Sequence, residues 1–234
     1  QEAAGKELAE MYDMHISGAV AFSDGLMPVQ SSGILVKALQ YVKVFNGVVM
    51  QIPDDKSIAP HGLMHEGIHS TRFGLAGKPI LAEELLVDRD IQLARYAGSR
   101  IHFTGVTSSR SFEYIRQAKK DGLPVSCSVT PYHLSFTDED LMNYDTQLKV
   151  YPPLRSKKEV TALKTALADG TIDCIATHHL PHEQDSKLTE FEYAAFGMIG
   201  LETCYPALRT AVPEISEEKW VDRSEEHTSE LQSH

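Results

Sequence analysis

Three histidines, His178, His179 and His182, lie within the six-residue segment 177–182. The segment directly follows an apolar run at 172–177, which has the pattern of a buried strand. Imidazole nitrogens at the end of a strand can bind a metal ion or a substrate anion. A polar loop with hydrogen-bonded histidines explains the same residues equally well. Both interpretations therefore stay open on this motif alone.

A second pair, His65 and His69, matches the pattern His-Glu-x-x-His. In zinc proteases this spacing places two ligands on one face of a helix, with the glutamate as general base. Here Gly67 lies inside the motif and Pro60 lies just upstream, which disfavours a regular helix. We therefore expect a loop at this position rather than a protease site.

Carboxylates follow two of the predicted strands, at Asp24 and at Asp54 and Asp55. Such groups could bind a cation or act as bases. Aspartate is also an ordinary turn residue after any strand, and we favour that interpretation. Cys174 lies inside an apolar run and is interpreted as a small core residue.

Short β-rich runs alternate with amphipathic stretches along the chain. The predicted strands are 18–23, 48–52, 101–106, 125–130 and 172–177, with a short extended run at 149–151. The predicted helices are 34–45, 79–97, 109–120, a short one that begins at Thr137, and 156–170. Pro79 is expected in the first turn of the second helix. Thr137 with Asp140 is expected to open the short helix, and Ser156 with Glu159 is expected to form a capping box at the start of the last one. This alternation predicts a parallel sheet with right-handed crossovers.

Two parallel folds fit this pattern, a doubly wound sheet and a (β/α)8 barrel. No Gly-x-Gly-x-x-Gly fingerprint follows any strand, which disfavours a dinucleotide-binding sheet. A complete barrel takes about 250 residues, so the chain would hold most of one. In either fold the chemistry lies beyond the C-terminal ends of the strands.

Composition excludes several classes of protein. The 234 residues carry 33 acidic and 22 basic side chains, a net charge of −11, with no Lys/Arg cluster, which argues against a nucleic-acid partner. No apolar run approaches the roughly 20 residues that span a bilayer, which argues against a membrane protein. Cys127, Cys174 and Cys204 are odd in number and widely spaced, which argues against a disulfide scaffold. The predicted compartment is the cytoplasm.

Both ends of the chain are unusual. The first residue is Gln1, with no initiator methionine and no signal peptide. Residues 223–234 have no apolar periodicity and resemble the translation of a sequencing-library adapter; a polar disordered tail is the alternative. We therefore expect a partial barrel domain over residues 1–222, a non-native tail over 223–234, and a chain that is a fragment open at both ends.

Six motifs, in order, resemble those of the dihydroorotases in the cyclic amidohydrolase superfamily. They lie at 18–24, at 70–77 with 82–84, at 129–134 with 137–140, at 152–155 (Pro-Pro-Leu-Arg), at 169–173 and at 196–202. The resemblance runs from about Ala9 to about Leu208. It implies an amidohydrolase (β/α)8 TIM barrel, incomplete at its N-terminus, and a role in pyrimidine biosynthesis. In this family a zinc centre activates the water that opens the dihydroorotate ring.

The resemblance also implies which positions form the site, and several depart from the family's pattern. The four visible metal-ligand positions fall on Gly25, Ile52, Gly105 and His178, and the substrate asparagine falls on Tyr151. His178 stands where the family has its catalytic aspartate. The substrate-binding positions His182, Phe196 and Gly197 are kept. The His-x-His pair of the first barrel strand would lie upstream of Gln1.

We therefore expect a dihydroorotase-like protein without hydrolytic activity and without a resident cofactor, acting as a structural or regulatory subunit. Degenerate members of this family assemble with aspartate transcarbamoylase, which is the implied partner, and a homo-oligomer is a further expectation. The alternative is an active cyclic amidohydrolase that interconverts carbamoyl-aspartate and dihydroorotate. In that case His178, His179 and His182 would join the upstream pair around zinc, within about 2.0–2.1 Å of a common point.

Overall fold

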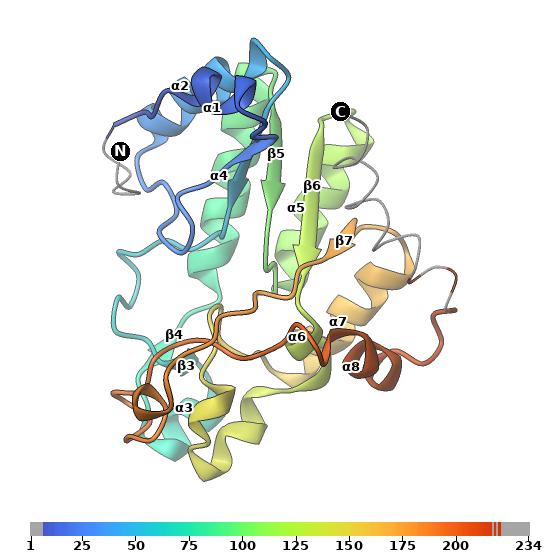
Figure 1. The fold of residues 1–234 in the computed structure, drawn as a ribbon. Helices are drawn as coiled ribbons and strands as arrows, with labels where there is room; N and C mark the ends of the chain where they lie inside the picture. Colours follow the sequence, from blue (N-terminus) through green and yellow to red (C-terminus); the bar gives the residue numbers. More distant parts are fainter. Residues whose placement is uncertain (1–6, 217, 219, 221–234) are drawn as a thin grey trace. The chain divides into compact units, whose positions relative to one another are not determined.

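The computed structural model describes residues 7–216, 218 and 220 (Figure 1). The chain divides into two compact units. Unit 1 comprises the residues up to 58 and 80–127, and unit 2 comprises 59–79 and the described residues from 128 onward. In the described part of the chain, no helix has both the length and the apolarity needed to cross a bilayer. The tail predicted at 223–234 lies outside the described residues.

Unit 1 is built from parallel strands and the helices that follow them, as the alternation predicts. The strands β1 (Ala21–Phe22), β2 (Val48–Gln51), β5 (Arg100–Phe103) and the first residues of β6 (Val125–Val129) pair in that order, all parallel. The helices are α1 (Met11–Ile16), α2 (Ser32–Lys43), α4 (Leu81–Ala97) and α5 (Ser109–Lys120), with α4 packed against both α2 and α5.

The helices of unit 1 bury the apolar faces that their spacing predicts. The side chain of Ser31 caps α2 by accepting the backbone N–H of Ile34, and Leu35, Leu39 and Val42 are fully buried. The long helix α4 begins at Leu81, with Ile80 as its N-cap residue. Pro79 therefore precedes the helix, and its predicted place in the first turn is wrong.

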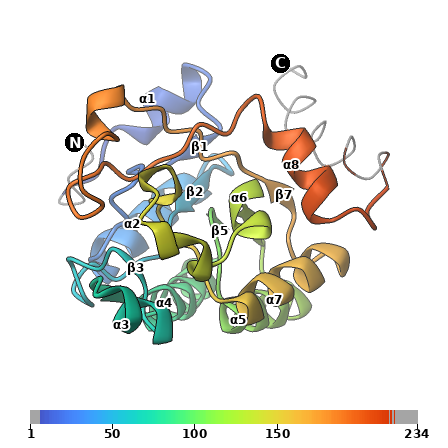
Figure 2. The ribbon, with the colours of Figure 1, turned by 90° about the horizontal axis from the view of Figure 1, so that it is seen from below.

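Unit 2 continues the parallel sheet pattern with shorter elements. The last residues of β6 pair with β7 (Cys174–Ile175), and β3 (Met64–His65) pairs with β4 (Gly77–Lys78), both in parallel. The helices are α3 (Ile68–Phe73), α6 (Pro131–Ser135), α7 (Lys157–Ala168) and α8 (Cys204–Ala211), with 3₁₀ turns η1 (Asp138–Asn143), η2 (Thr146–Leu148) and η3 (Gln184–Ser186). Helix α6 packs against α7 and α8 (Figure 2).

Several local predictions in unit 2 need correction. The extended run predicted at 149–151 forms no strand, although Lys149, the C-terminal cap of η2, has extended backbone angles. Helix α7 begins after Ser156 as predicted, but the Ser156 side chain makes no capping hydrogen bond, so the predicted capping box is wrong. The capping box at Thr137 and Asp140 does form, although it opens a 3₁₀ helix. Cys174 is buried in β7, which confirms its interpretation as a core residue.

Candidate functional site

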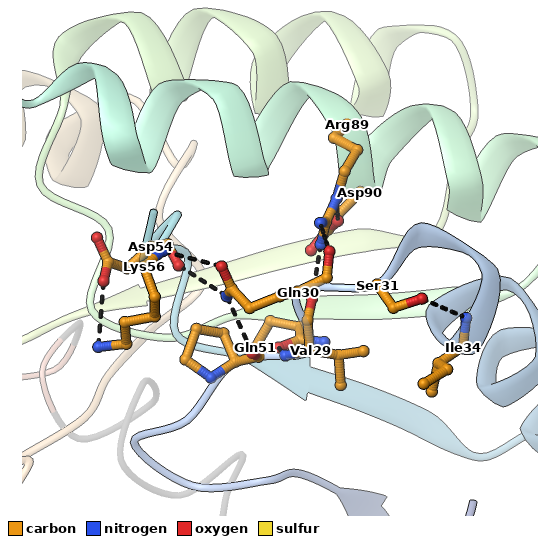
Figure 3. A network of polar contacts seen from close by, with 10 residues as sticks. Val29, Gln30, Ser31, Ile34, Gln51, Asp54, Lys56, Arg89 and Asp90 are labelled. Carbon is orange, nitrogen blue, oxygen red and sulfur yellow. Dashed lines mark hydrogen bonds and ion pairs between the residues drawn. The ribbon is translucent and has the colours of Figure 1, made fainter. Parts of the chain in front are cut away.

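The loops that follow β1 and β2 are tied together by the side chain of Gln30 (Figure 3). Its Nε2 donates to the carbonyl of Asp54 at 3.0 Å, and its Oε1 accepts the backbone N–H of Lys56 at 2.8 Å. Gln51, at the end of β2, accepts the backbone N–H of Val29 at 3.1 Å. These contacts give both loops a defined shape.

Arg89 on α4 holds the same loops from the helix side (Figure 3). Its guanidinium donates to the carbonyls of Gln30 at 2.6 Å and Val29 at 2.8 Å, and its Nε lies 2.7 Å from the carboxylate of Asp90. Asp90 is fully buried, and burial raises its pKa to about 7 against the opposing effect of Arg89. The polar network therefore supports the loops at the carboxyl ends of β1 and β2.

Of the aspartates that follow these strands, Asp54 and Asp55 have structural partners for their carboxylates, and Asp24 lies in a turn. Asp54 pairs with Lys56 at 3.1 Å. Asp55 accepts the backbone N–H of Ser57 at 2.9 Å, and the carbonyl of Asp24 accepts the backbone N–H of Met27 at 3.3 Å. Asp24 and Asp55 thus lie in turns, which confirms the simpler interpretation of these residues.

The three metal-ligand positions that fall in unit 1 carry no donor side chain. Ile52 is a buried aliphatic residue, 5% exposed. Gly25 and Gly105 have φ angles of 65° and 73°, in the left-handed region that favours glycine. Neither a sec-butyl side chain nor a hydrogen atom can coordinate zinc.

The loop around Gly105 is nevertheless held firmly. The carboxylate of Glu83, on α4, accepts the backbone N–H groups of Thr107 at 3.0 Å and Ser108 at 2.8 Å, and also the hydroxyl of Thr107. Glu83 is 2% exposed. The carboxylate thus satisfies the N–H groups of the two residues directly before α5 and fixes the loop that ends there.

In unit 2 the three neighbouring histidines bind different parts of the main chain. His178 has a φ of 42° and hydrogen-bonds to the backbone of Tyr151; burial lowers the pKa of its imidazole. His179 Nδ1 accepts the backbone N–H groups of Gly200 at 3.2 Å and Leu201 at 3.3 Å. Among residues 7–216, 218 and 220, no three His, Cys, Asp or Glu side chains are grouped so that they could hold a metal ion.

The three positions that the family resemblance assigns to substrate binding, His182, Phe196 and Gly197, do come together. His182 Nε2 donates to the carbonyl of Phe196 at 2.8 Å. A Cβ atom on Gly197 would lie 2.6 Å from the carbonyl oxygen of Leu180 and 2.9 Å from His182 Nε2, so only glycine fits there. The ring of Tyr151 meets that of Phe196 edge-on, with centroids 5.9 Å apart. The candidate site of unit 2 is therefore a cluster of His182, Phe196, Gly197, Tyr151 and His178.

Lys149 lies next to this cluster, although the sequence does not predict it as a candidate site residue. Lys149 is 2% exposed, and its Nζ lies 4.6 Å from the centroid of the Phe196 ring. Lysine is usually a surface residue, so its type gives no signal of burial. Only its position next to the apolar Val150 hints that it faces inward.

His65 and His69 do not form the metal pair of a zinc protease. His65 lies in β3 and His69 in α3, with the N-cap residue Gly67 between them. No single helix therefore carries both imidazoles, as expected, but the loop predicted here is wrong, because the segment forms the end of β3 and the start of α3. His65 Nδ1 lies 3.4 Å from Arg155, and burial, with a smaller contribution from Arg155, lowers its pKa to about 4.

Comparison with solved structures defines the class of fold. The chain matches an L-hydantoinase (dihydropyrimidinase) from Arthrobacter aurescens with a TM-score of 0.78 and 25% identity, over 91% of this chain and 51% of that one. It matches a dihydropyrimidinase from Brevibacillus agri with a TM-score of 0.76 and 19% identity, over 89% and 49%. The fold is thus the α/β TIM barrel of the amidohydrolases, of which the chain holds part.

Sequence comparison identifies the family. Residues 1–111 match the family model described as dihydro-orotase-like. A dihydroorotase from Pelotomaculum thermopropionicum is 50% identical over 199 residues, 85% of this chain and 47% of the relative. One from Caldanaerobacter subterraneus is 42% identical over 206 residues, 88% and 48%. The chain belongs to the dihydroorotase-like family, and it spans about half the length of the curated relatives it matches.

Proposed function

We propose that the chain is part of a dihydroorotase-like protein of pyrimidine biosynthesis that has lost hydrolysis and serves as a structural or regulatory subunit. The observation that carries this proposal is the residue set at the visible metal-ligand positions. Gly25, Ile52 and Gly105 offer no donor atom, and His178 replaces the family's aspartate.

Water activation in this family depends on carboxylate and imidazole donors that hold zinc and on an anionic base. Burial lowers the pKa of His178, so its imidazole is neutral at pH 7. A neutral imidazole cannot replace the negative charge that an aspartate supplies next to a divalent cation. The residues present therefore do not fit the zinc centre, and no catalytic step is assigned to it.

The supports of the fold persist beside these losses. Glu83 still holds the loop after β5, and Gln30 and Arg89 still hold the loops after β1 and β2. A protein that is kept for its shape requires these contacts and does not require the metal donors. This contrast supports a role in assembly rather than in turnover.

The proposed partner is aspartate transcarbamoylase, and this part of the proposal rests on the family resemblance. The proposed compartment is the cytoplasm. Mixing the intact gene product with aspartate transcarbamoylase from the same organism, followed by analytical ultracentrifugation, should give a complex heavier than either protein. Separate sedimentation at micromolar concentration would remove the partner from the proposal. A self-associated species in the control run without the partner would indicate the homo-oligomer.

The loss of hydrolysis is tested on the intact gene product, because this chain covers about half of its relatives. Dihydroorotate and carbamoyl-aspartate are supplied in separate assays with added zinc. We expect no interconversion above the buffer control in either direction. Turnover at ordinary enzyme rates, of about 1 s⁻¹ or more, would contradict the proposal.

A further inference from the structure

The segment from His182 to Met198 carries Phe196 and Gly197, yet it contains little regular backbone structure. Its one named element is the 3₁₀ turn η3. A long loop without a strand or helix ladder must satisfy its backbone carbonyls in another way if it is to keep one shape. In this chain two lysine side chains supply the donors.

Lys149 binds the middle of the loop. Its Nζ donates to the carbonyls of Phe191 at 2.7 Å and Glu192 at 2.9 Å. The backbone of the same lysine binds the end of the loop, because its carbonyl accepts the N–H of Gly197 at 2.9 Å. The ammonium group also lies over the ring of Phe196. One residue thus contacts both halves of the segment.

Lys187 binds the loop from within. Its Nζ donates to the carbonyl of Ala195 at 2.7 Å and to that of Thr146 at 3.0 Å. The hydroxyl of Thr146 returns a hydrogen bond to the carbonyl of Lys187 at 2.6 Å. These reciprocal contacts join the loop to η2, the turn directly before Lys149.

Both ammonium groups are buried, since Lys149 is 2% and Lys187 6% exposed. Within the described residues neither forms an ion pair with a carboxylate, and their hydrogen bonds run to backbone carbonyls. Burial lowers the pKa of both lysines, and the charge of Lys187 lowers that of Lys149 further. A buried charge is costly unless polar groups solvate it, and here carbonyl oxygens do so.

We propose that Lys149 and Lys187 are positioning residues, whose ammonium groups hold the 182–198 loop so that Phe196 and Gly197 lie against His182. The ligand-lining role of that loop rests on the proposed function. The manner in which the loop is held does not, because it follows from contacts within unit 2. A test without any ligand therefore separates the two proposals.

The test uses hydrogen–deuterium exchange of the full chain, without substrate or metal. Lys149→Met and Lys187→Met keep most of the side-chain length without the ammonium group. The first leaves the carbonyls of Phe191 and Glu192 without their lysine donor, and the second leaves that of Ala195, since the Thr146 carbonyl still accepts the N–H of Lys149. Lys158→Met, on the exposed side of α7, is the matched control. We expect amides within 182–198 to exchange at least about tenfold faster in the two test variants, with α4 and β5 unchanged. Unchanged loop exchange would overturn the proposal, and so would a uniform increase across both units.

Chemical rescue distinguishes hydrogen bonding by the ammonium group of Lys149 from packing of its aliphatic chain. In Lys149→Ala, added n-propylammonium, which matches the atoms removed beyond Cβ, should restore slow exchange of the loop, whereas n-propanol should not. Equal rescue by both compounds would show a packing role and overturn the proposal.

The unmodified protein supplies a test that does not depend on the folding of a variant. Buried, hydrogen-bonded ammonium groups exchange their protons slowly, so ¹⁵N spectra of the lysine side chains should show two slowly exchanging signals. Their absence would contradict the proposal.

Discussion

His178 and Tyr151, which stand at two positions where the family resemblance leads us to expect an aspartate and an asparagine, are joined by a hydrogen bond from the His178 imidazole to the backbone of Tyr151. Because this bond raises the pKa of the imidazole, the backbone group must be the carbonyl, which accepts the imidazole proton. The aspartate of the family could not donate this bond while ionised. The bond therefore needs a donor such as the histidine at 178, whereas any residue at 151 would supply the carbonyl.

Reversing one replacement should not restore the chemistry. His178→Asp is expected to fold, since aspartate, like histidine, tolerates the left-handed backbone found at this position. It should nevertheless bind no stoichiometric zinc, because Gly25, Ile52 and Gly105 still supply no donor. Zinc content by mass spectrometry and dihydroorotate turnover of the intact protein check this. Zinc binding that appears in His178→Asp and not in His61→Asp, at an exposed histidine, would contradict it.

Gly197→Ala should disrupt the cluster that His182 forms with Phe196. The new methyl group would meet the carbonyl oxygen of Leu180 at 2.6 Å, and the φ of 146° is itself unfavourable for alanine. Gly170→Ala is the matched control, because Gly170 has a φ of 81° but open space around its Cβ position. Backbone strain costs each variant about 1–2 kcal/mol, and overpacking adds about 1–3 kcal/mol at Gly197 alone. Equal free energies of unfolding for the two variants would show that the close contact is not formed.

Glu83→Gln should lower stability more than its conservative chemistry suggests. Glutamine Oε1 can still accept both backbone N–H groups, but the amide nitrogen in place of Oε2 cannot accept the hydroxyl of Thr107, and the remaining bonds lose the strength that the negative charge gives them. We expect a loss of about 1–3 kcal/mol in the free energy of unfolding, measured by urea titration. Glu113→Gln, at an exposed position of α5, should change it by less than about 0.5 kcal/mol. A similar small effect in both variants would be evidence against the network.

Acidification should destabilise the protein through His133. This residue is fully buried, its Nε2 lies 2.9 Å from the carbonyl oxygen of Pro152, and burial lowers its pKa to about 3. Its pKa in the unfolded chain is near 6.5, so between these values the unfolded state binds the proton and the folded state does not. Stability is therefore lost as the pH falls from 6.5 towards 3, by up to about 1.4 kcal/mol per pH unit.

His133→Gln removes the titrating imidazole and keeps an N–H donor for the carbonyl of Pro152. Between pH 6.5 and pH 4.5 the variant should lose about 2 kcal/mol less stability than the parent. His61→Gln, at an exposed histidine, should follow the parent curve. Parallel curves for all three proteins would contradict the assignment to His133.

Much of the fold could be predicted because the apolar spacing of the elements is strong. The helix at 109–120 appears with the predicted bounds, and the strand at 48–52 is shorter by one residue. The short helix α6 was not predicted, because it begins directly after a strand, at Thr130 and Pro131, and has only five residues. The capping box at Ser156 failed because Glu159 is buried in the unit and 8% exposed. Local capping decided the first case, and tertiary packing decided the second.

The candidate site could be predicted only where motifs name the residues. His182, Phe196 and Gly197 belong to recognisable segments, and the structure places them in contact. Lys149 and Lys187 could not be found in this way, since their partners are backbone carbonyls, which leave no trace in the sequence. The hydrogen bond from His178 to Tyr151 likewise could not be predicted, because its acceptor is the backbone of Tyr151 and not the tyrosine side chain.

Zinc stoichiometry of the intact gene product tests the central claim most directly. The protein is dialysed against zinc at neutral pH, freed of unbound metal, and measured for metal per chain by mass spectrometry. The loss of donors at Gly25, Ile52 and Gly105 predicts well below one zinc per chain. About two zinc ions per chain, removed by a chelator together with dihydroorotate turnover, would contradict the account.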